Sequence, residues 1–138
     1  IDHEPGGEIA KGLVVLLGIH ESDTPEDSAW ILRKLLNLRI FDDQNGTPNL
    51  SVQDVEGELL VVSQFTLHAN TKKGNRPSYN SAAKPDVAIP LYERFLEDLH
   101  NQFSGTVNTG KFGAYMAVSL TNDGPFTIIL DSKNPTLE

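Results

Sequence analysis

Cysteine is absent from this 138-residue sequence, and its absence excludes disulfide bonds, catalysis by a thiolate and zinc sites built on cysteine. Long apolar runs are also missing. The longest, LVVLLGI at residues 13–19, falls far short of the roughly 20 residues that a membrane-spanning helix needs, and no signal-like segment with a basic flank precedes it. We therefore expect a soluble, cytoplasmic protein that makes no use of a membrane.

Cations are scarce, because 11 Lys and Arg face 19 Asp and Glu and the net charge is −8. Since phosphate contacts need Lys and Arg, this balance argues against nucleic-acid binding over the whole surface. The one dense basic stretch is TKKGNRP at residues 71–77, which holds Lys72, Lys73 and Arg76. Two interpretations of it stay open, a solvated loop and a local site for phosphate groups.

The length and the 38% of hydrophobic residues suit one globular domain, and we assign it residues 1–138. Apolar stripes predict helices at residues 25–37 and 85–103, the first with a Thr-Pro start. Apolar and β-branched runs predict strands at residues 12–19, 58–67, 107, 115–120 and 126–130, and a hairpin between residues 39–41 and 50–52. Residues 58–67 form the strongest strand and should be central. The order predicts an α+β fold with a curved, mixed or antiparallel, barrel-like sheet and two packed helices.

Hydrolytic chemistry would need a nucleophile or an activated water, a base, and donors for an oxyanion. Ser63 and Thr66 supply hydroxyl groups in VVSQFTL, although in a regular strand they would face opposite sides unless the strand bulges or ends between them. Neighbouring backbone could equally satisfy both hydroxyls. Of the scattered histidines only His68 follows this strand closely, and no nucleophile motif or metal-ligand spacing is present. We therefore expect neither a metal nor a cofactor.

The stretch TNDGPFT, residues 121–127, joins two of the predicted strands. Asp-Gly suits the centre of a hairpin, but Pro125 follows where the returning strand should donate its first hydrogen bond. Glycine tolerates positive φ, and an X-Pro bond can be cis at a cost of about 0.5–1 kcal/mol. The stretch is therefore either a tight turn before an edge strand or a functional corner.

Several segments together resemble the D-aminoacyl-tRNA deacylase family, also called D-tyrosyl-tRNA deacylases. The family's Ser-Gln-Phe-Thr-Leu signature is matched by residues 63–67, and its Asn-x-Gly-Pro-x-Thr signature by residues 122–127. The basic loop, the run LNLRIF at residues 36–41 and the pairing of TG at 109–110 with FGA at 112–114 also match. The resemblance thus covers nearly the whole chain.

The resemblance implies an enzyme that hydrolyses the ester bond of D-aminoacyl-tRNA, in chiral proofreading during translation, with glycyl-tRNA as a second substrate. The pocket would take the 3′-terminal adenosine and the aminoacyl ester, and the 2′-hydroxyl of the tRNA itself would help to position or activate water. The implied residues are Ser63, Gln64, Phe65 and Thr66 for catalysis, Lys72, Lys73 and Arg76 for the tRNA acceptor end, and Gly124 and Pro125, supported by Asn122 and Thr127, for chirality.

In this family the Gly-Pro bond is cis, and the corner of one subunit reaches into the pocket of the other. The resemblance therefore implies a homodimer in which Gly124 and Pro125 form a chiral filter. Their carbonyl groups would exclude L-aminoacyl substrates by a rigid clash, which separates isomers without extra affinity for the correct one.

The sequence departs from the family's usual pattern in three places. The family usually begins with a strand carrying Gln-Arg-Val before a Ser-Val-x-Val run, whereas this chain starts at Ile1-Asp2, so we expect that strand to be missing and the dimer and pocket to be incomplete. Phe126 replaces the usual Val, and Tyr115 stands where an acid is common. Two alternatives to this enzyme stay open, a noncatalytic module that binds nucleic acid or protein, and a general esterase.

Overall fold

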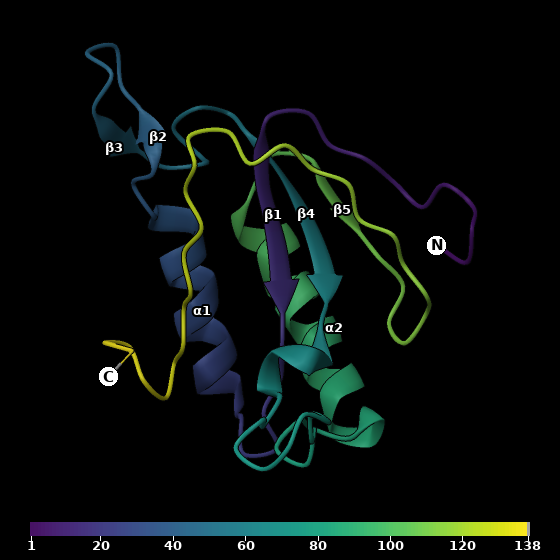
Figure 1. Ribbon diagram of the computed structural model, residues 1–138. Helices are drawn as coiled ribbons and strands as arrows, with labels where there is room; N and C mark the ends of the chain where they lie inside the picture. The colour runs from purple at the N-terminus through teal and green to yellow at the C-terminus, as the bar shows by residue number, and fades with distance from the viewer. Residues whose placement is uncertain (138) are drawn as a thin grey trace.

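The computed structural model of the protein describes residues 1–137 (Figure 1). In chain order the elements are β1 (Gly12–Leu17), α1 (Pro25–Asn37), β2 (Phe41–Asp42), β3 (Pro48–Leu50), β4 (Glu58–Ser63), the 3-10 helix η1 (Phe65–His68), α2 (Pro85–Gln102) and β5 (Val107–Thr109). Both predicted helices are confirmed, and so is the short hairpin, now β2 and β3. Neither helix of the described residues has the length and apolar character needed to cross a membrane.

The main sheet has three strands in the order β1-β4-β5, and both pairings are parallel. The central place of β4 is therefore confirmed. The sheet is not closed among the described residues and its strands are not antiparallel, so the barrel-like, antiparallel form of the prediction is not found. The reason is topological: each helix returns the chain to the same end of the sheet, and such crossovers join parallel strands.

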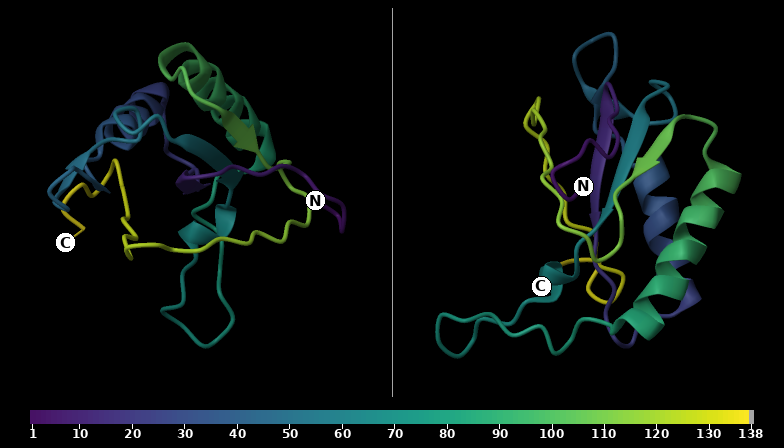
Figure 2. Two further views of the ribbon diagram at one scale, coloured as in Figure 1. Left: turned by 90° about the horizontal axis from the view of Figure 1, so that it is seen from above. Right: turned by 90° about the vertical axis from the view of Figure 1, so that its right-hand side faces the viewer.

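The two helices cover one face of the sheet, as both views in Figure 2 show. Helix α1 begins with Pro25 in its first turn, and the Thr24 backbone N–H donates to the Asp27 carboxylate at 2.9 Å. This hydrogen bond satisfies a backbone donor at the start of the helix that has no acceptor within the helix. Alternate residues of β4 then point into the helix layer, and Leu59 and Val61 are fully buried there.

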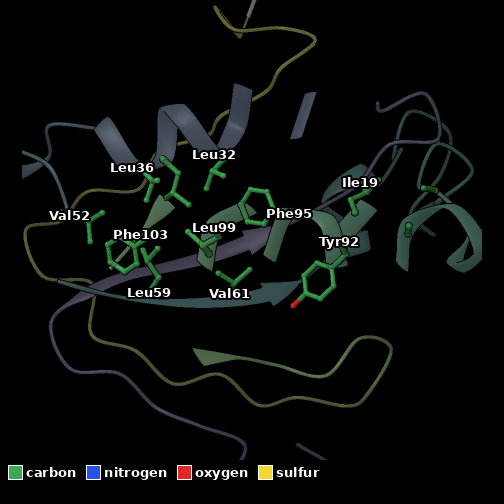
Figure 3. Packing of buried hydrophobic residues seen from close by; sticks show 13 residues of the cluster. Ile19, Leu32, Leu36, Val52, Leu59, Val61, Tyr92, Phe95, Leu99 and Phe103 are labelled. Atoms are coloured by element: carbon green, nitrogen blue, oxygen red, sulfur yellow. The ribbon is translucent and has the colours of Figure 1, made fainter. Parts of the chain in front are cut away.

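The hydrophobic core lies between this sheet face and the helices (Figure 3). Leu32 and Leu36 of α1 and Phe95 and Leu99 of α2 meet over β4, as the predicted stripes require. Each fully buried side chain of this size contributes about 1.5–3 kcal/mol relative to exposure. The core therefore fixes the positions of the strand ends.

The C-terminal part of the chain differs most from the prediction. Residues 115–120 and 126–130 were predicted as strands, but neither forms a strand in this structure, and residues 117–129 are all exposed. The segment runs past the sheet face opposite the helices (Figure 2). Strand propensity alone cannot hold a strand, because its backbone groups need a neighbouring chain to pair with. Among the described residues no strand pairs with this segment, although the Asp2 backbone N–H donates to the Tyr115 carbonyl at 2.8 Å.

Candidate active site

Residues 63–66 lie at the carboxyl edge of the parallel sheet. Strand β4 ends at Ser63, which is in register with Leu17 at the end of β1, and the Gln64 backbone N–H donates to the Leu17 carbonyl at 2.8 Å. The predicted strand over 58–67 is thus too long, because η1 begins at Phe65. The carboxyl ends of parallel strands are where open α/β sheets place their ligands.

The early end of β4 removes the requirement that the side chains of Ser63 and Thr66 point to opposite faces of the sheet. Once the strand has ended, side chains no longer alternate between the faces of the sheet, so the two hydroxyls need not point apart. The Gln64 side-chain amide donates to the Thr66 hydroxyl at 2.5 Å. This bond occupies an acceptor site on Thr66 and leaves its O–H free to donate.

Gly18 allows η1 to approach β1 closely. A Cβ atom at this position would lie 3.1 Å from the Gln64 carbonyl oxygen, from Leu67 Cβ and from His68 Cδ2. Such distances are shorter than ordinary van der Waals contact, so a side chain here would push η1 outward. The glycine therefore helps to fix Gln64 and Thr66 against the strand end.

The side chain of Phe65 projects into solvent and is 55% exposed. Its ring meets the ring of Tyr79 edge to face, with centroids 5.2 Å apart. An exposed aromatic pair offers a face on which a nucleic-acid base can stack. Tyr79 is a contact that the sequence did not predict, because it depends on the loop after η1 folding back.

His20 and His68 form a second pair at this edge, with ring centroids 5.4 Å apart. The sequence placed His68 close to Ser63 and Thr66 but gave no sign of His20, which is 48 residues away. The parallel register of β1 and β4 brings the two together, because both histidines follow the ends of neighbouring strands.

The basic loop projects from the same end of the molecule (Figure 2). Asn70 and Ser78 close its neck through two backbone hydrogen bonds of 2.7 and 2.9 Å. Lys72, Lys73 and Arg76 are all exposed on it. The structure therefore places the three predicted cations on a loop that follows η1 and whose base is fixed.

The corner at residues 121–127 is closed by a hydrogen bond of 2.8 Å from the Asn122 side-chain amide to the Thr127 hydroxyl. Gly124 has φ of +139°, a conformation that favours glycine. The expected cis bond before Pro125 is not found, since every peptide bond among the described residues is trans. Both residues are exposed, and an X-Pro bond without packing contacts prefers trans by about 0.5–1 kcal/mol.

Within the chain this corner does not meet residues 63–66. Figures 1 and 2 show that the yellow-green segment crosses near the end of the sheet where β1 and β4 begin. Helix η1 follows the opposite end, where these strands finish. The two signatures of the family are therefore separated by the length of the sheet.

Lys133 ties the end of this segment to the start of α1. Its ammonium group lies 2.8 Å from the Asp27 carboxylate and 3.9 Å from that of Asp23. Burial works to raise the pKa of Asp27, but hydrogen bonds from Lys133, Thr24 and Ser132 outweigh it and lower that pKa to about 2. The hydrogen bond with Asp27 raises the pKa of Lys133. We call this contact the C-terminal latch.

A large cleft of about 2390 Å³ separates the C-terminal segment from the open face of the sheet. Val14, Leu60 and Val62 line it from the strands, and Phe126 and Ile128 line it from the segment. Several large apolar side chains on these elements are exposed, namely Leu16, Tyr115, Val118, Leu120, Phe126, Ile128 and Ile129. The described residues hold no group of three or more metal-ligating side chains.

The parallel sheet with helices on one face makes this an α/β protein, and the turn with its hydroxyl and amide groups lies at the sheet edge where such proteins bind ligands. The family model described as D-Tyr-tRNA(Tyr) deacylase matches residues 1–131, so the chain belongs to this family. That match confirms the resemblance deduced from the two signatures.

Relatives named D-aminoacyl-tRNA deacylase agree with this assignment. The chain is 58% identical over 134 residues to the one from Parabacteroides distasonis and 56% identical over 134 residues to the one from Flavobacterium johnsoniae. Each alignment covers 97% of this chain and 89% of the relative.

Two solved structures share the fold. One is named c-Myc DNA Unwinding Element Binding Protein, with a TM-score of 0.84 and 44% identity, covering 89% of this chain and 83% of the other. A probable eukaryotic D-amino acid tRNA deacylase has a TM-score of 0.70 at 18% identity, covering 83% of this chain and 81% of the other. The second likeness concerns the fold alone.

Proposed function

We propose that the protein hydrolyses the ester bond of D-aminoacyl-tRNA and releases a free D-amino acid and tRNA. The observation that carries this proposal is the fixed turn at residues 63–66, at the carboxyl edge of the sheet, in a chain that belongs to the deacylase family. The names of relatives at 56% and 58% identity support the same activity. Such an enzyme would act in the cytoplasm, where tRNA is charged.

The turn supplies the donors that ester hydrolysis needs. The backbone N–H groups of Phe65 and Thr66 open η1 and have no acceptor within that helix. These two N–H groups and the free O–H of Thr66 would donate hydrogen bonds to the ester carbonyl oxygen as it gains negative charge. Phe65 would stack on the 3′-terminal adenine, and Ser63 and Gln64 would complete the pocket wall.

Thr66 is a poor candidate for the nucleophile. The hydrogen bonds recorded among the described residues give its hydroxyl one partner, the amide of Gln64, which cannot accept a proton as a base does. We infer that the 2′-hydroxyl of the terminal ribose positions the attacking water. Water oxygen then bonds to the ester carbon, the 3′-oxygen leaves, and a proton from the water ends on that oxygen.

We propose that the Gly124-Pro125 corner of a second copy completes the pocket and rejects L-aminoacyl substrates. This proposal is supported by the exposure of the corner, by its distance from η1 within one protomer, and by the hydrogen bond that makes it rigid. Glycyl-tRNA would pass the same filter, because glycine has no side chain to clash. We therefore include glycyl-tRNA, mischarged on the tRNA for alanine, as a second substrate.

The same proposal requires a homodimer. The apolar side chains exposed on the C-terminal segment, among them Leu120, Ile128 and Ile129, are 49–68% exposed and would be covered by the second copy. Sedimentation equilibrium should give twice the protomer mass, and Ile129→Lys should shift the protein toward monomer. A folded wild-type protein that remains monomeric at micromolar concentration would overturn the cross-subunit filter.

A second candidate function is binding of nucleic acid without catalysis, and the likeness to the c-Myc DNA Unwinding Element Binding Protein favours it. Incubation with D-tyrosyl-tRNA distinguishes the two, since only the enzyme releases D-tyrosine. A D-tyrosine ethyl ester serves as the control for a general esterase. Release from the tRNA and not from the simple ester supports the proposed function, whereas retention of intact D-tyrosyl-tRNA contradicts it.

A further inference from the structure

A hollow of about 540 Å³ lies beside η1, separate from the turn at residues 63–66. His20, His68 and Lys72 line it, together with the hydroxyl-bearing Thr71 and Ser81. We propose that this hollow binds a backbone phosphate of the tRNA acceptor end through His20, His68 and Lys72, and that protonation of the two imidazoles strengthens the binding. The identity of this ligand rests on the proposed function.

The walls of the hollow are held by the backbone. The Glu21 backbone N–H donates to the Ser81 carbonyl at 2.9 Å, and the Ala83 N–H donates to the Ile19 carbonyl at 2.8 Å. These bonds fix the segment that carries His20 against the segment before α2. On the other side, Gly18 lets His68 pack against the end of β1. The two imidazoles are thus placed by strand ends and not by mobile loops.

The hydrogen bonds of His20 define which ring nitrogen can donate to a ligand. Its Nδ1 accepts from the Ser22 backbone N–H at 3.0 Å and lies 2.8 Å from the Ser22 hydroxyl. Because Nδ1 is an acceptor here, the neutral ring carries its proton on Nε2 and can donate from that atom. Protonation adds a full positive charge and turns Nδ1 into a donor, so the Ser22 backbone N–H loses its acceptor while the Ser22 hydroxyl can accept from Nδ1.

The charges around the hollow favour an anion. Lys72 is outside the three ion pairs that the described residues form, and its backbone N–H is fixed by the Asn70 side chain at 2.9 Å. Two carboxylates lie on the His20 segment. Glu21 is exposed to water, and Asp23 accepts from the His20 backbone N–H at 2.8 Å while its other oxygen faces Lys133.

A phosphate is the ligand that these groups suit. Imidazolium, ammonium and hydroxyl groups are all donors to phosphate oxygens, and hydrogen bonds between charged partners are about twice as strong as neutral ones. A metal ion would instead be repelled by the ammonium of Lys72. Because a charged imidazolium is a stronger donor to phosphate than a neutral imidazole, the affinity should be higher at pH 6 than at pH 8.

The first test uses the wild-type protein and inorganic phosphate. Proton NMR of the imidazole resonances should show that phosphate shifts the signals of His20 and His68 and leaves those of His100, an exposed histidine on α2, in place. Equal shifts of all three, or none, would overturn the site. This test needs no variant and so cannot fail through misfolding.

The second test compares uncharged tRNA binding to His20→Gln/His68→Gln with the control variant His100→Gln. Wild type and control should gain about tenfold in affinity from pH 8 to pH 6, a value typical of one added hydrogen bond to a charged group. The double variant should lose that gain, and its salt dependence should flatten by about 0.7–0.9 in the log-log slope. In deacylation its KM should rise while kcat stays unchanged.

The outcomes separate this site from the proposed function. If wild type hydrolyses D-tyrosyl-tRNA but the double variant keeps the pH dependence of tRNA binding, the phosphate site is wrong and the enzyme stands. In the other outcome, wild type does not hydrolyse D-tyrosyl-tRNA, but phosphate still shifts the signals of His20 and His68 and the double variant loses the gain in tRNA affinity at pH 6. That result would support the phosphate site and contradict the deacylase function.

Discussion

The C-terminal latch makes a prediction about stability that can be worked out from the structure. Asp27→Asn keeps the size of the side chain and an oxygen that can still accept from the Thr24 backbone N–H, but it removes the charge that faces Lys133. We expect the variant to fold and to unfold at a lower concentration of urea than wild type at pH 7.

The magnitude follows from the pKa of Asp27. A fall from 3.8 to about 2 corresponds to at most about 2.4 kcal/mol in favour of the ionised folded state. Asp27 is only 16% exposed, but its partner Lys133 is 46% exposed, and solvent weakens such a pair. We therefore expect a loss of about 1 kcal/mol in the free energy of unfolding.

The sign of the pH dependence is fixed by the direction of the shift. Because the folded protein lowers the pKa of Asp27, its contribution is fully present above pH 3.8 and is lost as the pH falls through about 2. The difference between wild type and Asp27→Asn should therefore be constant from pH 5 to 8 and shrink below pH 4. A change of this stability difference with pH above pH 5 would have to come from another group.

Urea unfolding followed by circular dichroism at several pH values measures the difference, with Glu97→Gln as the control. Glu97 is an exposed acid on α2, outside the ion pairs of the described residues, so its loss of charge should leave stability within about 0.5 kcal/mol. Equal stability of Asp27→Asn and wild type at pH 7, or a difference that persists unchanged at pH 2, would refute the latch.

Three further predictions concern activity. Gly18→Ala should push η1 outward and lower kcat about tenfold without unfolding the protein, and a wild-type kcat would show that the 3.1 Å contacts are easily relieved. Lys72→Ala/Lys73→Ala should weaken tRNA binding and flatten its salt dependence while leaving the preference for D over L intact, so unchanged binding across salt would remove the basic loop from the interface. Gly124→Ala should strain a backbone with φ of +139° and change the D-to-L rate ratio, and a folded variant with the wild-type ratio would show that the corner is only a turn.

Local patterns predicted the elements whose structure depends on a single stretch of chain. The start of α1 at Pro25 and its apolar stripe through Leu32 and Leu36 are confirmed. The central strand predicted over residues 58–67 is confirmed over residues 58–63. Each depends on periodicity or on capping chemistry, which act over a few residues. The signature singled out residues 63–66, but as part of a strand over 58–67, and not as the turn that follows β4.

Features that depend on pairing across the fold were not predictable in the same way. The parallel order β1-β4-β5 is set by where the helices return the chain, and it brings His20 to His68 without any local signal. The bond from Lys133 to Asp27 joins residues 106 positions apart. The strands predicted over 115–120 and 126–130 do not form, because an apolar run gives a strand propensity but supplies no partner strand.

The most direct test of the proposed function is the ratio of initial deacylation rates on D-tyrosyl-tRNA and L-tyrosyl-tRNA, measured with the same tRNA and the same wild-type protein. A chiral deacylase should hydrolyse the D form at least about a hundredfold faster, which corresponds to about 2.7 kcal/mol of discrimination between the two transition states. Equal rates on the two isomers, or hydrolysis of neither, would contradict it.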